Sequence, residues 1–167
     1  MRHWGMLAAT AVLRAACADE PTPEELARQA ERDIALVEQA NASMPPLRQV
    51  TPEPILYPDV QRHDLLGAAC NYAPGTSLGT RVIAREADAF MKIDGTMERF
   101  AADPGARELP QRTRSLYNSR NYALRLRVNG EGEPDSAGKT TYEGTVTLFD
   151  KHGRIIYEGV GLAQCSG

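Results

Sequence analysis

Residues 140–165, TTYEGTVTLFDKHGRIIYEGVGLAQC, contain two long runs in which apolar and polar side chains alternate. A polar turn that begins at Asp150 and ends at Gly153 separates the two runs, which is the pattern of a β-hairpin. The simplest register places Asp150 opposite Gly153. We expect the rest of the chain to be built around this hairpin.

Glycines give the hairpin a notch on its inner face. In the simplest register Leu148 faces Ile155, and Gly144 faces Gly159. Glycine inside a strand either permits sharp curvature or lets another element approach closely. We therefore expect this hairpin to close a curved sheet.

Shorter strands precede the hairpin. Asp94-Gly95 is the strongest turn signal among them, because this dipeptide favours the tight turns of β-hairpins. The expected strands are residues 66–72, 81–86, 89–93, 96–101 and 122–128, followed by the two strands of the hairpin. Residues 106–121 read as a long loop or irregular strand, and residues 129–139 as a flexible surface loop. The prediction is a mainly β fold, an antiparallel barrel or sandwich of about seven strands with an N-terminal helix.

The N-terminal part has a different organisation. Thr22 to Glu25 form a capping box, and an apolar stripe that continues to about Ala40 predicts a helix. Five prolines between residues 44 and 58 predict an extended, semi-rigid spacer without helix. The expected parts are a signal peptide at residues 1–18, the helix at 19–43, the proline-rich spacer at 44–64 and the antiparallel β domain at 65–167.

The first residues, MRHWGMLAATAVLRAACADE, have basic side chains ahead of a short apolar run and then small residues. This is the layout of a secretory signal peptide. Cleavage before Cys17 would resemble the processing of a bacterial lipoprotein, with a lipid on that cysteine. Cleavage after Ala18 would instead give a soluble secreted protein. We expect lipidation of Cys17, and a periplasmic protein anchored to the outer membrane.

Two further cysteines, Cys70 and Cys165, form an even pair in a chain expected to be exported. An oxidising compartment favours a disulfide between them. The alternative is two buried free thiols. We expect the disulfide.

Enzymatic and metal-binding motifs are weak. Residues 75–79, GTSLG, match a nucleophile elbow around Ser77, but that motif needs a strand before it and a helix after it. The following residues alternate like a strand instead. His63 and Asp64 are adjacent, a spacing that cannot present both side chains to one metal ion. We expect no enzyme activity, no cofactor and no metal.

Charge is uneven along the chain. Removal of residues 1–16 takes away Arg2 and Arg14, which leaves 17 basic and 22 acidic residues, a net charge of −5. This balance does not suggest a nucleic-acid partner. Residues 107–127, however, carry six arginines against Glu108, a local charge of +5. Arginine forks beside tyrosine rings suit phosphate, carboxylate or sugar surfaces, although a solvated strand face would show the same pattern.

The layout of the β region resembles that of the periplasmic inhibitors of C-type lysozyme. The similarity covers an early strand cysteine, hairpin strands such as AFMKIDG, a loop that ends in tyrosine, and a late cysteine. In that family a loop of Ser-Gly, two residues and Tyr enters the lysozyme cleft. Here the corresponding residues are 113–117, TRSLY, in which Tyr117 matches while Thr113 and Arg114 replace Ser and Gly. The chain also resembles small uncharacterised lipoproteins of the Gram-negative envelope.

These features predict a non-enzymatic envelope lipoprotein that binds a protein, such as a lysozyme-like enzyme, or an anionic glycan. The expected partner-binding residues are Arg112, Arg114, Ser115, Tyr117, Arg120 and Tyr122. The alternative is a structural or assembly lipoprotein of the outer membrane that makes its contacts through the N-terminal helix.

Overall fold

The computed structural model describes residues 21–42 and 44–167. The expected signal peptide and Cys17 lie outside the described residues. The chain divides into two compact units, with the boundary between Pro46 and Leu47. Within the described part, no helix has the length and apolar character needed to cross a membrane.

The described part of the first unit contains one helix, α1 (Pro23–Ala42), which begins at the expected capping box. The Thr22 N–H donates to Glu25 Oε2 at 2.8 Å, and the Glu25 N–H donates to Thr22 Oγ1 at 3.3 Å. This reciprocal bonding satisfies backbone donors that the first turn would otherwise leave free. No residue of α1 is buried.

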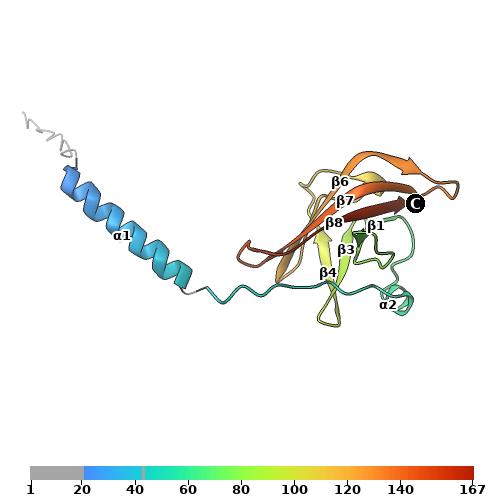
Figure 1. The fold of residues 1–167 in the computed structure, drawn as a ribbon, viewed down its shortest axis with the longest axis horizontal. Helices are drawn as coiled ribbons and strands as arrows, with labels where there is room; N and C mark the ends of the chain where they lie inside the picture. Colours follow the sequence, from blue (N-terminus) through green and yellow to red (C-terminus); the bar gives the residue numbers. More distant parts are fainter. Residues whose placement is uncertain (1–20, 43) are drawn as a thin grey trace, which may run out of the picture. The chain divides into compact units, whose positions relative to one another are not determined.

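The second unit is a closed barrel of eight antiparallel strands (Figure 1). Each strand pairs with the next along the chain, and β8 pairs with β1 to complete the closure. The strands are β1 (Ala69–Pro74), β2 (Val82–Ala84), β3 (Asp88–Ile93), β4 (Thr96–Ala102), β5 (Leu116–Asn118), β6 (Tyr122–Pro134), β7 (Thr140–Asp150) and β8 (Ile155–Ser166). The mainly β, antiparallel prediction is confirmed, with a barrel in place of a sandwich and one strand more than the expected seven.

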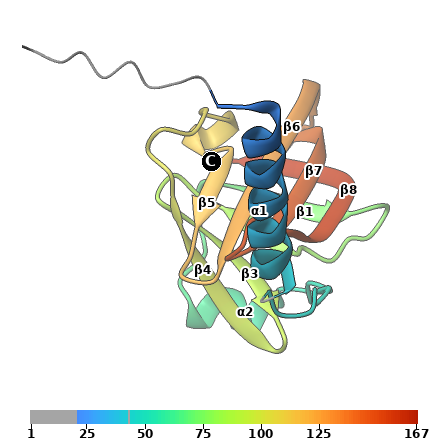
Figure 2. The ribbon, with the colours of Figure 1, turned by 90° about the vertical axis from the view of Figure 1, so that its left-hand side faces the viewer.

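The additional strand is β5, which lies in the segment expected to be a loop or irregular strand. It pairs with β4 through Asn118 opposite Ala101, and with β6 through Tyr117 opposite Leu124. A second difference concerns the expected loop at residues 129–139, because β6 continues to Pro134. Figure 2 shows β5 between β4 and β6, where it completes the wall of the barrel.

The 140–165 hairpin forms, but its predicted register is wrong by two residues. Leu148 lies opposite Tyr157, and Gly144 lies opposite Gly161. The Asp150 carboxylate accepts hydrogen bonds from the backbone N–H groups of His152 and Arg154, both at 2.9 Å, and so holds a longer turn than the expected one. From Thr140 to Leu148 and from Tyr157 onward, a two-residue shift keeps side chains on their expected faces, because side chains alternate with a period of two.

A register irregularity at the turn end of the hairpin determines which of two isoleucines is buried. The shift lies between Leu148 and Phe149 on β7. Beyond it Ile155 is exposed, whereas Ile156 is buried in the core. The expected contact between Leu148 and Ile155 is therefore replaced by burial of Ile156.

The glycine notch lets β1 approach closely. A Cβ atom at Gly161 would collide with the backbone carbonyl oxygen of Ala73 in β1. A Cβ atom at Gly159 would instead meet the hydroxyl groups of Tyr157 and Tyr72. Tyr72 is fully buried and burial raises the pKa of its hydroxyl, so this side chain stays neutral inside the barrel. Of the two roles expected for these glycines, the structure shows close approach.

We expect Gly161→Ala to lower the free energy of unfolding by about 3 kcal/mol, the upper end of the usual cost of overpacking. The obstructing atom belongs to the backbone of a paired strand, which cannot move without breaking the β1–β8 ladder. Gly159→Ala should cost about 1 kcal/mol, because tyrosine side chains can shift. Urea denaturation of both variants measures the difference. Equal losses would show that backbone approach at Gly161 has no special role.

The barrel core is formed by inward-facing side chains from all eight strands and by Leu109 and Val50. The largest fully buried side chains are Tyr72, Tyr117, Phe100, Met91, Leu124, Leu126 and Leu148. A second cluster lies on the outer face of β2 and β3, where Ile83 and Phe90 pack with Ile55, Leu65 and Ala69. Both faces of these two strands are therefore buried.

The segment expected to be a spacer packs against the barrel from Leu47 onward. The backbone N–H groups of Val50, Glu53 and Ile55 donate to carbonyl groups of the barrel unit at 2.8 to 2.9 Å. The segment also contains a short helix, α2 (Tyr57–Arg62), with Pro58 in its first turn. Proline is tolerated there because the first N–H groups of a helix have no intrahelical partner. Residues 47–65 therefore form a covering segment on the barrel. The prediction that the prolines exclude helix from this segment is wrong, because α2 lies within it.

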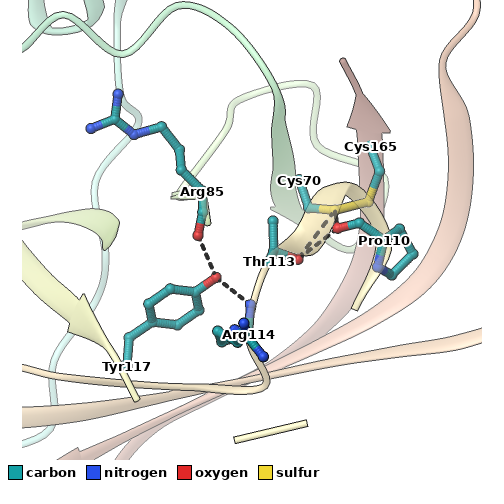
Figure 3. Close-up of a disulfide and its surroundings, with 7 residues drawn as sticks. All are labelled: Cys70, Arg85, Pro110, Thr113, Arg114, Tyr117 and Cys165. Atoms are coloured by element: carbon teal, nitrogen blue, oxygen red, sulfur yellow. Dashed lines mark hydrogen bonds between the residues drawn. A yellow bond between two sulfur atoms is a disulfide. The ribbon is translucent and has the colours of Figure 1, made fainter. Parts of the chain in front are cut away.

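The predicted disulfide between Cys70 and Cys165 is confirmed (Figure 3). The two cysteines lie directly opposite each other in β1 and β8, with a Cα–Cα distance of 4.0 Å. Both are buried beneath the 3₁₀ turn η1 (Pro110–Arg112). The Thr113 hydroxyl beside them donates to the Pro110 carbonyl at 2.8 Å and lies 3.7 Å from Cys70 Sγ. The bond therefore joins the first and last strands of the barrel at its seam.

Candidate anion-binding site

The arginines predicted to bind a partner have different surroundings in the structure. Arg112 lies in η1, is exposed and forms an ion pair with Glu86 at 2.7 Å. Arg114 is more enclosed and forms a longer ion pair with Glu108 at 3.6 Å. Acidic neighbours therefore already offset the charge of both side chains.

Tyr117 and Thr113 are fully buried, so the structure does not present Tyr117 to a partner. The Tyr117 hydroxyl accepts a hydrogen bond from the Arg114 N–H at 2.6 Å and donates one to the Arg85 carbonyl at 2.9 Å. Burial raises the pKa of this hydroxyl, which keeps the proton that it donates. The assignment of Tyr117 to partner binding is corrected to a structural role, in which it ties residues 113–117 to the β2–β3 turn.

The remaining predicted residues are dispersed. Arg120 is exposed in the turn between β5 and β6, and Tyr122 is half-buried against the core. Ser115 is half-buried, and its backbone connects two neighbouring segments. Its N–H donates to the Arg107 carbonyl at 2.9 Å, and its carbonyl accepts from the Leu126 N–H at 3.1 Å.

These backbone bonds bring together three arginines that we call the arginine face: Arg107, Arg125 and Arg127. All three line one shallow surface pocket of about 330 Å³, together with Ser115. Arg125 and Arg127 lie on the outer face of β6, as the alternation of that strand predicts. Arg107 reaches the pocket from the preceding loop through the bond to Ser115.

The arginine face is a local excess of positive charge. None of its three guanidinium groups forms an ion pair with a carboxylate of the described residues. Arg125 lies over the ring of Phe149 at 4.9 Å, an orientation that restricts the side chain without neutralising its charge. Thr147 on β7 lies opposite Arg125. The Thr147 hydroxyl donates a hydrogen bond to the Glu158 carboxylate on β8 at 3.4 Å. Charge is thus available here for an external anion.

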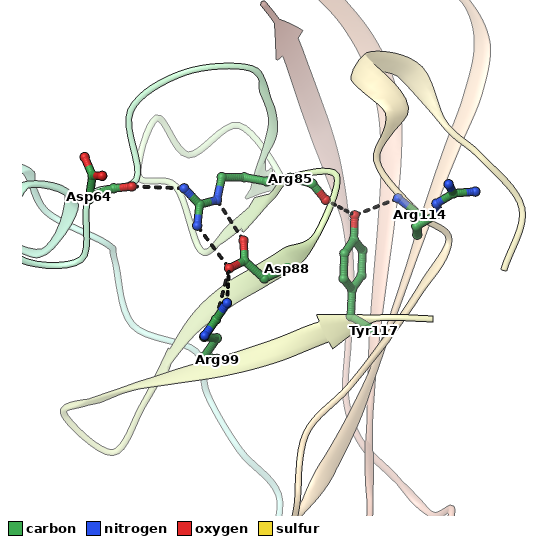
Figure 4. Close-up of polar contacts among 6 residues, drawn as sticks. All are labelled: Asp64, Arg85, Asp88, Arg99, Arg114 and Tyr117. Atoms are coloured by element: carbon green, nitrogen blue, oxygen red, sulfur yellow. Dashed lines mark hydrogen bonds and ion pairs between the residues drawn. The ribbon is translucent and has the colours of Figure 1, made fainter. Parts of the chain in front are cut away.

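In a second charged cluster, two arginines already share one buried carboxylate (Figure 4). The buried carboxylate of Asp88 accepts from Arg85 at 2.8 and 3.0 Å and from Arg99 at 3.0 Å. Arg85 also donates to the Asp64 carbonyl at 2.9 Å. This cluster connects the covering segment, the β2–β3 turn and β4. Its two neighbouring pockets, of about 510 and 340 Å³, are both lined by Arg85 and Asp88, which are already paired with each other.

The described structure does not support the Ser77 nucleophile-elbow motif or a metal site. Ser77 lies in the loop between β1 and β2, where its hydroxyl accepts from the Gly79 N–H at 3.1 Å. The element that follows is the strand β2, whereas a nucleophile elbow is followed by a helix. Within residues 21–42 and 44–167, no group of three or more His, Cys, Asp or Glu side chains is arranged to hold a metal ion.

Searches of family models, of curated proteins and of solved structures each returned no match for this chain.

Proposed function

We propose that this protein is a non-enzymatic envelope lipoprotein that binds an anionic glycan or an acidic protein through its arginine face. The observation that carries the proposal is that Arg107, Arg125 and Arg127 all line one pocket, and that none of them forms an ion pair with an acidic residue of the described part. Arginine is suited to this role because its planar fork binds carboxylate and phosphate oxygens in pairs.

The proposed location rests on the sequence pattern of residues 1–18 and on the disulfide. The signal-peptide layout and Cys17 favour export and lipidation. A disulfide between Cys70 and Cys165 is typical of oxidising compartments such as the periplasm. Both features support a periplasmic location, and lipidation of Cys17 would supply the outer-membrane anchor.

Burial of Thr113 and Tyr117 bears on the choice of partner. In the lysozyme inhibitors that the layout resembles, the corresponding loop enters the enzyme cleft, whereas here these residues support the barrel. We therefore place the contact surface on the arginine face, and we favour an anionic glycan or acidic protein over a lysozyme-like enzyme.

A second candidate function uses α1, the element that the alternative prediction proposed. Its apolar residues Leu26, Ile34 and Val37 are each more than half exposed, at 52%, 58% and 59%. They recur at helical spacing and form one stripe. An assembly role would place this stripe against a partner helix or groove.

Two variants of the full chain distinguish binding through the arginine face from an assembly role of α1. Replacing Arg107, Arg125 and Arg127 with alanine should weaken capture of anionic envelope components by at least about 100-fold, because each charge-assisted hydrogen bond contributes about 1.5 to 3 kcal/mol. Replacing Leu26, Ile34 and Val37 with serine should leave capture unchanged. Capture by immobilised wild-type and variant proteins from an envelope extract, measured at low and high salt, gives the comparison.

The matched control replaces Arg48, Arg112 and Arg120 with alanine, which makes the same change in net charge at exposed positions away from the pocket. It should retain nearly full capture. Loss of capture in the serine variant alone would favour the assembly role. Full capture by the arginine-face variant would reject the proposed function.

A further inference from the structure

One asparagine of the chain, Asn129, is followed directly by glycine. The other asparagines, which precede larger residues, are Asn41, Asn71, Asn118 and Asn121. Glycine has no Cβ atom, so its backbone nitrogen can approach the side-chain carbonyl carbon of the preceding asparagine. Asn129 and Gly130 are both exposed, and a Cβ atom at Gly130 would meet no heavy atom within 4 Å apart from its chain neighbours. The surroundings therefore leave room for a reaction within this pair.

The ladder between β6 and β7 is interrupted directly after Asn129. Asn129 lies opposite Glu143, and the pairing resumes only at Glu133, opposite Thr141. Within the gap, Gly130 has a φ of +82°. Strand pairing resists the backbone rotation that brings a nitrogen toward the preceding side chain, and this resistance is weakest where the ladder is broken. The reactive bond thus lies where the strand is least constrained.

We propose that Asn129 is a site of spontaneous deamidation, and that this modification lowers the affinity of the arginine face for anions. In the first step the Gly130 nitrogen forms a bond to Cγ of Asn129, and the side-chain amide leaves as ammonia. Water then opens the resulting succinimide ring at either carbonyl group, which gives aspartate or isoaspartate. Both products carry a carboxylate at position 129, so the modification adds one negative charge.

The new charge would lie beside the arginine face. Asn129 projects from the same face of β6 as Arg125 and Arg127, because side chains alternate along a strand. Cα atoms two residues apart in a strand are separated by about 7 Å, so residue 129 is a close neighbour of Arg127. Glu143, opposite residue 129, is exposed, and like charges in that arrangement repel each other. A carboxylate at position 129 is therefore drawn toward Arg127 and offsets part of the positive charge.

Incubation of the full chain in warm, mildly alkaline buffer, followed by peptide mass spectrometry, measures the modification. We expect Asn129 to deamidate at least about tenfold faster than Asn118 and Asn121, which are also exposed but lack a following glycine. Asn129→Gln keeps an amide at this position but requires a larger ring, so it should remove the fast reaction. Similar rates at Asn129, Asn118 and Asn121 would overturn the inference.

The effect on binding rests on the proposed function and is measured with heparin, an anionic glycan, as the probe. Asn129→Asp reproduces one product and should bind heparin about threefold more weakly than the wild type at low salt, from Coulomb repulsion at this separation in water. High salt should remove the difference. Asn121→Asp makes the same charge change before the start of β6 and should bind like the wild type, as should Asn129→Gln. Circular dichroism checks that each variant has folded.

Equal heparin binding by Asn129→Asp and the wild type, or no heparin binding by the wild type, would reject the effect on the arginine face. The two proposals can also fail separately. If Asn129 deamidates while envelope capture is independent of Arg107, Arg125 and Arg127, the proposed function falls and the modification site remains. If capture depends on these arginines but Asn129 is stable, only the present inference falls.

Discussion

Replacing both Cys70 and Cys165 with alanine should lower the free energy of unfolding by about 4 to 5 kcal/mol, on the chain-entropy model of disulfide stabilisation. The two cysteines are 95 residues apart in sequence, so the bond removes a large loop-closure entropy from the unfolded chain. A loss of this size is comparable to the whole stability of many small domains. We expect the variant to be largely unfolded at 37 °C.

Urea denaturation of the oxidised protein and of the double variant measures this loss. Because both cysteines are buried under η1, reductant should act slowly on the folded protein and rapidly in urea. Alkylation followed by mass measurement reports this difference directly. A change of less than about 1 kcal/mol in the double variant would contradict the chain-entropy account. The appearance of alkylatable thiols in native, non-reduced protein would contradict the bond itself.

Asp88→Ala is expected to cost about 3 to 5 kcal/mol, the usual penalty for removing one partner from a buried ion pair. The Asp88 side chain is only 4% exposed and binds both Arg85 and Arg99. Its loss leaves the partly buried Arg85 guanidinium without a carboxylate. Because the Arg85 carbonyl accepts from Tyr117, the disturbance should extend to residues 113–117.

Glu86→Ala provides the matched control. Glu86 lies in the same turn and pairs with Arg112, but its side chain is 52% exposed. Solvent screening limits the contribution of an exposed pair to at most about 1 kcal/mol. Thermal denaturation of both variants gives the comparison, and hydrogen exchange at residues 113–117 reports the extended effect. Similar losses in the two variants would show that burial of Asp88 does not set its contribution.

Much of the barrel could be predicted because its strands bury one face and expose the other. The alternation in β6, and in the 140–165 hairpin away from its turn, gave the correct faces, and Asp94-Gly95 gave the correct turn. The register could not be predicted, because it depends on backbone hydrogen bonds that the Asp150 carboxylate accepts within the turn. Strand β5 has only three residues, too few for a period of two to be recognised.

The candidate site was only partly predictable. The sequence placed six arginines in one segment, but it could not show which of them are already paired. The ion pair of Arg112 with Glu86 joins residues from separate loops, and only the folded chain brings them together. Likewise, Arg107 reaches the pocket through a backbone bond to Ser115. Tyr117 resembled a binding residue because arginines flank it in the sequence. In the fold it is the inward-facing residue of β5 and is buried in the core.

The disulfide at the barrel seam also determines how the domain would transmit tension. Residues between Cys70 and Cys165 form a covalently closed loop that contains six whole strands, β2 to β7. A pulling force applied between Leu47 and the C-terminus would pass directly from one cysteine to the other and bypass these strands. For a domain tethered through its N-terminal side, the arginine face would then lie on the unloaded part of the chain. Under such a force the bond would keep tension away from the candidate binding surface.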